Sequence, residues 1–157
     1  MRMSSAITVA AVATVLLAIV TLAPGQEKKI KRSDLPPAVE RAVVKEGEGA
    51  TIRGFSQERE NGQIFYEAEL IIDGHSKDVL MDVDGVVVEV EEEVGTESLS
   101  PAVLAGLQAK AGEGKLVKVE TLTKKGKLIA YEAQVRTNGR KSEVQVGPDG
   151  KPLDHEE

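Results

Sequence analysis

The sequence contains one pattern of residues twice. Residues 47–85 and 112–150 align without a gap at an offset of 65. The aligned pairs include Tyr66-Glu67-Ala68 with Tyr131-Glu132-Ala133, and Asp84-Gly85 with Asp149-Gly150. Because a duplicated unit of this length is a supersecondary module, the sequence predicts two tandem copies of one module.

Each copy is predicted to begin with one short helix. In the first copy, Ser33 or Asp34 is the expected cap, and the two prolines that follow suit the first turn, where their missing N–H groups cost nothing. In the second copy, Ser100 is the expected cap and Pro101 opens the helix. Both helices span only about three turns, so each needs a sheet on which to pack.

Three two-residue turns follow each helix and predict four antiparallel strands per copy. Asn-Gly and Asp-Gly pairs between alternating runs are strong hairpin signals, because both central residues adopt positive φ. The turns are expected at Asn61-Gly62, Asp73-Gly74, Asp84-Gly85, Lys125-Gly126, Asn138-Gly139 and Asp149-Gly150. The last strand of the second copy, Lys151 to Asp154, is short.

The alternation of apolar and polar residues assigns the two faces of each sheet. The apolar face of one strand, which the helix covers, carries Tyr66, Ala68 and Leu70. Its solvated face carries Phe65, Glu67, Glu69 and Ile71. The predicted fold class is α+β, with two tandem repeats that each pack one short helix on a four-stranded antiparallel meander sheet. Because a module of about 60 residues is marginal alone, the two are expected to support each other, side by side or as one continuous sheet.

The first 25 residues have the layout of a secretory signal peptide. Arg2 precedes an uncharged, mostly apolar run, and Ala23-Pro24-Gly25 places small residues before a cleavage at Gln26. Residues 26–33 read as a basic linker. The protein is therefore predicted to be exported, to the periplasm or the cell exterior. Because the apolar run is long and positive charges follow it, an N-terminal membrane anchor is the alternative.

The composition narrows the functional classes. A formal net charge of −6 repels phosphate backbones, so nucleic acid is not an expected partner. The chain has no cysteine, which excludes disulfides and thiolate metal sites. Its two histidines, His75 and His155, are expected in exposed loops without ligand spacing. No serine lies in a nucleophile elbow, so no catalytic residue is predicted. Together with the absence of cysteine and of histidines at ligand spacing, this predicts no metal site and no cofactor. The protein is therefore not expected to be an enzyme.

Several short motifs occur in the same order in both copies. The first copy contains Leu-Pro-Pro-Ala-Val at 35–39, Tyr-Glu-Ala-Glu-Leu at 66–70 and Asp-Val-Asp-Gly-Val at 82–86. This order resembles the PepSY-like repeats of bacterial exported proteins, with repeat 1 at residues 34–94 and repeat 2 at residues 99–154. The resemblance implies a helix on an antiparallel sheet, similar to beta-lactamase inhibitor proteins, and no catalytic motif. PepSY modules also occur in metallopeptidase propeptides, so it further implies restraint of a peptidase.

The solvated sheet face is the candidate binding site. Phe65 and Ile71 flank Glu67 and Glu69 there, and apolar residues beside carboxylates suit a protein-binding surface. The function predicted is an exported, non-catalytic binding module that inhibits or regulates a secreted or periplasmic peptidase or another envelope protein. The alternative is a cation or small-ligand sensor that uses the acidic segment Glu89 to Glu97.

Overall fold

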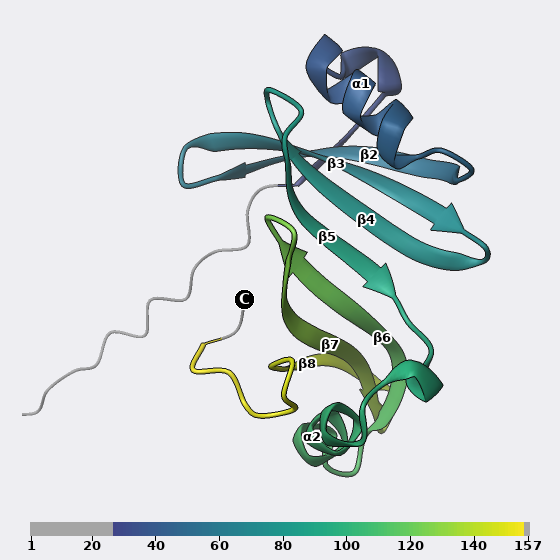
Figure 1. Cartoon of the computed structure of the whole chain (residues 1–157), viewed down its shortest axis with the longest axis vertical. Helices are drawn as coiled ribbons and strands as arrows, with labels where there is room; N and C mark the ends of the chain where they lie inside the picture. Colours follow the sequence, from purple (N-terminus) through teal and green to yellow (C-terminus); the bar gives the residue numbers. More distant parts are fainter. Residues whose placement is uncertain (1–26, 156–157) are drawn as a thin grey trace, which may run out of the picture.

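The computed structural model describes residues 27–155, which form a single eight-stranded antiparallel sheet with two α-helices (Figure 1). The expected leader, residues 1–25, lies outside the described residues. The strands are neighbours in chain order from β1 to β8, so the sheet is an uninterrupted meander. The α+β class and the antiparallel meander are therefore confirmed, and the sheet is continuous.

The sheet strands are mostly seven to eleven residues long. Their bounds are β1 Lys28–Ile30, β2 Thr51–Glu60, β3 Gln63–Ile72, β4 His75–Asp82, β5 Val87–Glu93, β6 Lys115–Lys124, β7 Lys127–Thr137 and β8 Arg140–Val146. β1 lies within the segment that the sequence marks as a basic linker, and it pairs with β2. Lys151 to Asp154 do not form the expected strand, so three strands follow the second helix, not four.

Two α-helices, α1 (Pro37–Glu46) and α2 (Pro101–Ala111), precede the two groups of strands. Ser100 caps α2 as expected, because its Oγ accepts a hydrogen bond from the backbone N–H of Val103 at 3.2 Å. The expectation for α1 is wrong: its N-cap is Pro36, while Ser33 and Asp34 belong to a preceding 3₁₀ turn. The α-helices in the described part of the chain have 10 and 11 residues, too short and too polar to cross a membrane.

Four of the six predicted turns have the expected geometry. Both central residues have positive φ at residues 61–62, 73–74, 125–126 and 138–139. At the other two turns only the glycine does, with φ of +76° at Gly85 and +78° at Gly150. Each of these turns is one residue wider than predicted, since Asp82 N–H bonds Val86 C=O and Gly147 N–H bonds Lys151 C=O.

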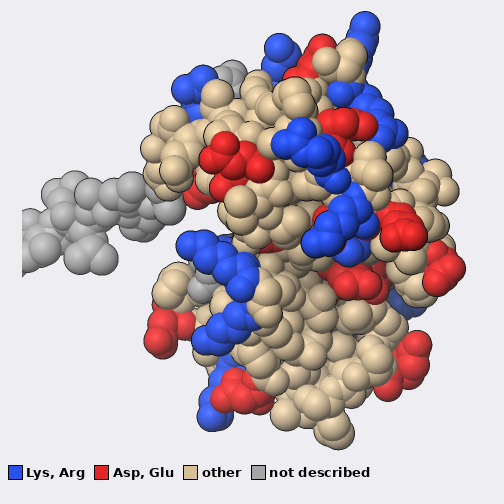
Figure 2. Space-filling view, turned by 45° about the horizontal axis from the view of Figure 1, so that its top comes forward, with Lys and Arg blue, Asp and Glu red and all other residues tan. Residues whose placement is uncertain are grey.

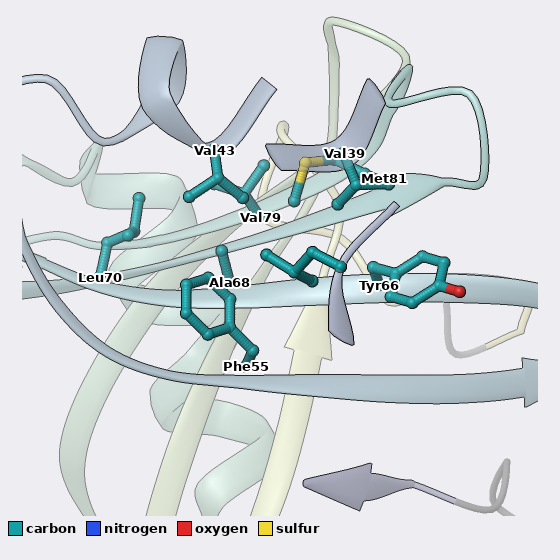
Figure 3. Close-up of a cluster of buried hydrophobic side chains, with 9 residues drawn as sticks. Val39, Val43, Phe55, Tyr66, Ala68, Leu70, Val79 and Met81 are labelled. Atoms are coloured by element: carbon teal, nitrogen blue, oxygen red, sulfur yellow. The ribbon is translucent and has the colours of Figure 1, made fainter. Parts of the chain in front are cut away.

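Both helices pack on the same face of the sheet. In Figure 3, Val39 and Val43 of α1 point toward Val79 and Met81 of β4, and all four are fully buried. This first core cluster also contains Leu35, Phe55, Tyr66, Ala68 and Leu70. The cluster under α2 contains Leu99, Val103, Leu107, Val119, Ala133 and Val146, and Tyr131 packs against it. The predicted apolar face is confirmed.

The two wide turns each approach the start of a helix closely. A Cβ placed on Gly85 would lie 2.5 Å from the carbonyl oxygen of Ala38 in α1. A Cβ placed on Gly150 would lie 2.2 Å from the carbonyl oxygen of Ala102 in α2. Because glycine has no side chain, each turn can approach the first turn of its helix this closely while the helix packs on the sheet.

Candidate functional site

The sheet has a second face that neither α-helix of the described residues covers, called here the helix-free face. Its residues alternate with the core residues along each strand, and cross-strand pairing places them beside one another. On β2 to β6 they include Ser56, Glu58, Phe65, Glu67, Glu69, Ile71, Asp78, Leu80, Glu89, Glu91, Glu93, Lys118 and Glu120. Carboxylates therefore greatly outnumber ammonium groups on this face.

Three carboxylates from three neighbouring strands meet on this face. Asp78 of β4, Glu91 of β5 and Glu120 of β6 have oxygens that all lie within 4.8 Å of one another. Glu120 is only 4 % exposed, and it pairs with the Lys118 ammonium at 2.5 Å. The Oγ of Ser76 lies 3.4 Å from a Glu120 oxygen. We call these three residues the carboxylate cluster.

Burial and mutual repulsion disfavour the charged form of two cluster members. Desolvation, followed by the nearby charges of Glu132 and Glu120, raises the pKa of Glu91 to about 8. Desolvation, followed by the charge of Glu67, raises the pKa of Asp78 to about 6. Charged carboxylates at these positions are thus held at a cost in free energy, which a positively charged ligand would offset.

Other carboxylates on the helix-free face have hydrogen-bond or ion-pair partners within the chain that stabilise their negative charge. The backbone N–H of Ser76 donates to Glu93 at 3.1 Å and lowers the pKa of that carboxyl. The salt bridge between Lys124 and Glu89 spans 3.6 Å. Figure 2 shows basic and acidic side chains interspersed over one side of the molecule. On the helix-free face, the two carboxylates whose pKa is raised most, Asp78 and Glu91, lie opposite each other on β4 and β5.

The four predicted binding residues lie on this face, but in different surroundings. Glu67 accepts a hydrogen bond from Ser56 Oγ at 2.5 Å, and Glu69 pairs with the Lys29 ammonium of β1. Phe65 lies at one end of the face, while Ile71 lies at the other, opposite Ser76. All four predicted residues are half-buried, not fully solvated.

Sequence reasoning missed the cluster members Asp78 and Glu120. Their alternation with buried Val79 and Val119 could have placed each on the solvated face of its strand. Their meeting could not have been found in this way, because it depends on the pairing of β5 with β6 across the two halves of the chain.

A hollow of about 740 Å³, called here the apolar hollow, opens at the Phe65 end of the face. Its apolar walls are Phe65, Leu80, Val86, Val87 and Val88. Val86 is 57 % exposed, so a large part of its hydrocarbon surface is open to solvent at this hollow. The remaining lining residues include Glu60, Asp82, Glu89 and Lys124.

The raised pKa of Glu91 predicts that stability falls as pH rises. The folded state holds this proton up to about pH 8, while the unfolded state loses it near the ordinary value of 4.5. Between these values the folded state binds more protons, so the free energy of unfolding decreases with pH and stays lower above pH 8. The Glu91→Gln variant is expected to be more stable than the wild type at pH 9, by about 1–2 kcal/mol.

Denaturant unfolding from pH 5 to pH 9 measures this difference. Glu97→Gln is the matched control, because Glu97 is exposed in the short 3₁₀ helix before α2. An equal decline with pH in the wild type and Glu91→Gln would contradict the assignment of the titration to Glu91.

The fold and this face define an α+β protein with one meander sheet, two helices on one side and an acidic, partly apolar surface on the other. No protein-family model matches the sequence, and no curated protein matches it. Solved structures match the fold. A DUF2874 family protein from Bacteroides ovatus has a TM-score of 0.59 at 20% identity, covering 77% of this chain and 86% of that one.

Two further structures have the same fold. A BLIP-like (beta-lactamase inhibitor protein-like) protein from Bacteroides fragilis has a TM-score of 0.56 at 23% identity, covering 76% of this chain and 83% of that one. A candidate periplasmic protein from Bacteroides eggerthii has a TM-score of 0.62 at 18% identity, covering 76% of this chain and 86% of that one. The expected likeness to the beta-lactamase inhibitor architecture is thus found in the fold, while none of these proteins is named as PepSY.

Proposed function

We propose that this protein is an exported, non-catalytic binding module whose helix-free face docks a protein partner. One observation carries the proposal: the face holds Asp78 and Glu91 as partly desolvated carboxylates with raised pKa values, beside a hollow whose apolar walls include the exposed Val86. Such an arrangement weakens the fold and is retained more readily where it serves binding. The partner is expected to present positive charge, because a nearby cation favours the ionised form of Asp78 and Glu91 and so lowers their raised pKa values.

The absence of catalysis is inferred from the available chemistry. The sequence contains no cysteine, and its two histidines, His75 and His155, are both exposed. His75 lies 3.8 Å from Glu93 at the start of β4. The protein therefore acts by binding, and an envelope peptidase is the class of partner to which the resemblance to PepSY-like repeats points.

Export and duplication are part of the same proposal. The layout of residues 1–25 supports a signal peptide, and a similar fold in a candidate periplasmic protein supports the same compartment. We infer that the two halves descend from one module. The matching approaches of Gly85 to Ala38 and of Gly150 to Ala102 support this descent, because the two glycines are aligned in the sequence repeat at the offset of 65 and the two alanines at an offset of 64.

Site-specific photo-crosslinking tests the docking face. A benzoylphenylalanine residue in place of Ile71, on the helix-free face, is expected to form a covalent adduct with a protein from the native cell envelope. The same residue in place of Val44, which is 59 % exposed on α1, is the control and is expected to form none. Equal adducts from the two positions, or none from either, would contradict the proposal.

The carboxylate cluster favours a second candidate, a cation sensor. Three carboxylates within 4.8 Å of one another suit a hard divalent cation, and Glu91 belongs to the acidic segment that suggested this function. Repeating the unfolding series at pH 7 with calcium chloride tests it. Calcium should stabilise the wild type and not the Glu91→Gln variant; no stabilisation of the wild type rules the sensor out.

A further inference from the structure

A second, smaller hollow adjoins the apolar hollow on the helix-free face. It has a volume of about 100 Å³ and is called here the acidic hollow. Its lining comprises Glu58, Glu67, Asp78, Leu80, Glu89 and Glu91. Leu80 and Glu89 line both hollows, so the two are adjacent. An apolar surface and an acidic surface therefore lie next to each other at Leu80 and Glu89.

Among the described residues that line the acidic hollow there is no lysine or arginine, and the Lys118 ammonium, whose charge acts on Asp78, pairs with Glu120. Five of its six lining residues are carboxylates, which come from the four neighbouring strands β2 to β5. The Lys124 ammonium that reaches Glu89 belongs to the lining of the apolar hollow. A guanidinium or ammonium group from outside would therefore find several acceptors in the acidic hollow.

The apolar hollow offers a different kind of contact. Val86 projects into solvent from the turn between β4 and β5, and Phe65 and Val88 are half-buried beside it. Burying these surfaces under a partner's apolar side chain removes hydrocarbon from water, which is favourable in proportion to the area covered. Apolar anchors in such hollows commonly supply much of the binding energy of an interface.

Lining residues of the two hollows alternate along β3 with the side-chain period of a strand. Phe65 lines the apolar hollow, and Glu67, two residues further along β3, lines the acidic one. Residues two apart in an extended chain point to the same side, roughly 7 Å from each other. A partner strand thus has the same repeat as the surface that it would cover.

Building on the proposed function, we propose that the partner docks an extended segment in which an apolar side chain enters the apolar hollow and an arginine or lysine two residues away enters the acidic hollow. The charge of the acidic hollow selects the cationic residue, and the hydrocarbon walls select its neighbour. A purely basic segment satisfies only one of the two hollows.

A synthetic peptide, acetyl-Ser-Arg-Ser-Leu-Ser-Arg-Ser-amide, tests this inference by NMR titration of the purified, nitrogen-15-labelled protein. It carries arginine on both sides of the leucine, so either chain direction is accommodated. The peptide is expected to bind with a dissociation constant below about 1 mM and to shift amide signals of β3, β4 and β5. Peptides with serine for leucine, or with glutamine for both arginines, are each expected to bind about tenfold more weakly.

Protein variants with matched controls locate the contacts. Val86→Ser is expected to weaken binding about tenfold, while Val117→Ser, at a valine that is 55 % exposed on β6, leaves it unchanged. Asp78→Asn is expected to weaken binding as well, while Asp73→Asn, in the exposed turn between β3 and β4, does not.

Three results would overturn the inference. The first is the absence of peptide binding, and the second is equal binding by Val86→Ser and the wild type, which would indicate attraction by charge alone. The third is self-association that Val86→Ser abolishes, which would show that a second copy of the chain fills the apolar hollow. The proposed function is judged separately: an adduct from Ile71 together with any of these results would retain the docking face and reject the two-hollow contact.

Discussion

Replacing Leu70 with alanine is expected to lower the free energy of unfolding by about 3–5 kcal/mol. Leu70 of β3 is 1 % exposed and is among the largest fully buried side chains of the protein. Its truncation removes hydrocarbon contacts and leaves a cavity between α1 and the sheet, which surrounding atoms fill only in part. A loss of this size is a large share of the total stability of a small domain, about 5–15 kcal/mol.

The same substitution in the other core cluster tests how the two halves are coupled. Leu107 of α2 is fully buried, so Leu107→Ala is expected to cost a similar amount. Because β5 and β6 join the halves in one sheet, each variant is expected to unfold in a single transition shifted to lower denaturant. Val44→Ala, on the exposed side of α1, is the control and is expected to change little.

Denaturant unfolding followed by circular dichroism measures these effects. Two transitions in Leu70→Ala, one of them at the wild-type midpoint, would show that the half under α2 folds on its own. That result would contradict the coupling that the continuous sheet implies.

Replacing Gly85 with alanine is expected to destabilise the protein by at least about 3 kcal/mol. Two costs add: the φ of +76° is unfavourable for alanine by about 1–2 kcal/mol, and the new Cβ would lie 2.5 Å from the Ala38 carbonyl oxygen. Relief of that contact requires α1 to move away from the sheet, which opens the first core cluster.

Gly74→Ala separates the two costs. Gly74 has a φ of +89°, but a Cβ there would meet nothing within 4 Å, so only the backbone cost of about 1–2 kcal/mol is expected. Thermal unfolding of the two variants measures the difference. Equal losses of stability in Gly85→Ala and Gly74→Ala would show that the close approach of Gly85 to Ala38 of α1 adds no cost to a side chain at this position.

The local elements of the fold could be predicted because each depends on neighbouring residues. Alternation along β3 placed Tyr66 and Leu70 in the core and Glu67 on the other face, as the structure has them. Ser100 was identified as a cap from its position before Pro101. These signals arise from the side-chain period of a strand and from hydrogen bonds within one turn, so no distant residue is needed.

Other features depend on contacts between distant parts of the chain. The segment from Lys151 to Asp154 has a strand-like pattern, but no neighbouring strand pairs with it, so the sheet ends at β8. The candidate site was predicted only in part: Glu67 was placed on the correct face, but the apolar hollow needs residues of β3, β4, β5 and β6 together.

The amino-acid sequence by itself determined the order of the two α-helices and of strands β2 to β8, four of the six turns and the face to which the residues of β3 point, because these follow from backbone sterics and short periodicities. Tertiary structure decided that β5 pairs with β6, and so brought Asp78, Glu91 and Glu120 together. Pairing between the halves is set by the free energy of the whole sheet, and the burial that it produces raises the pKa values of Asp78 and Glu91.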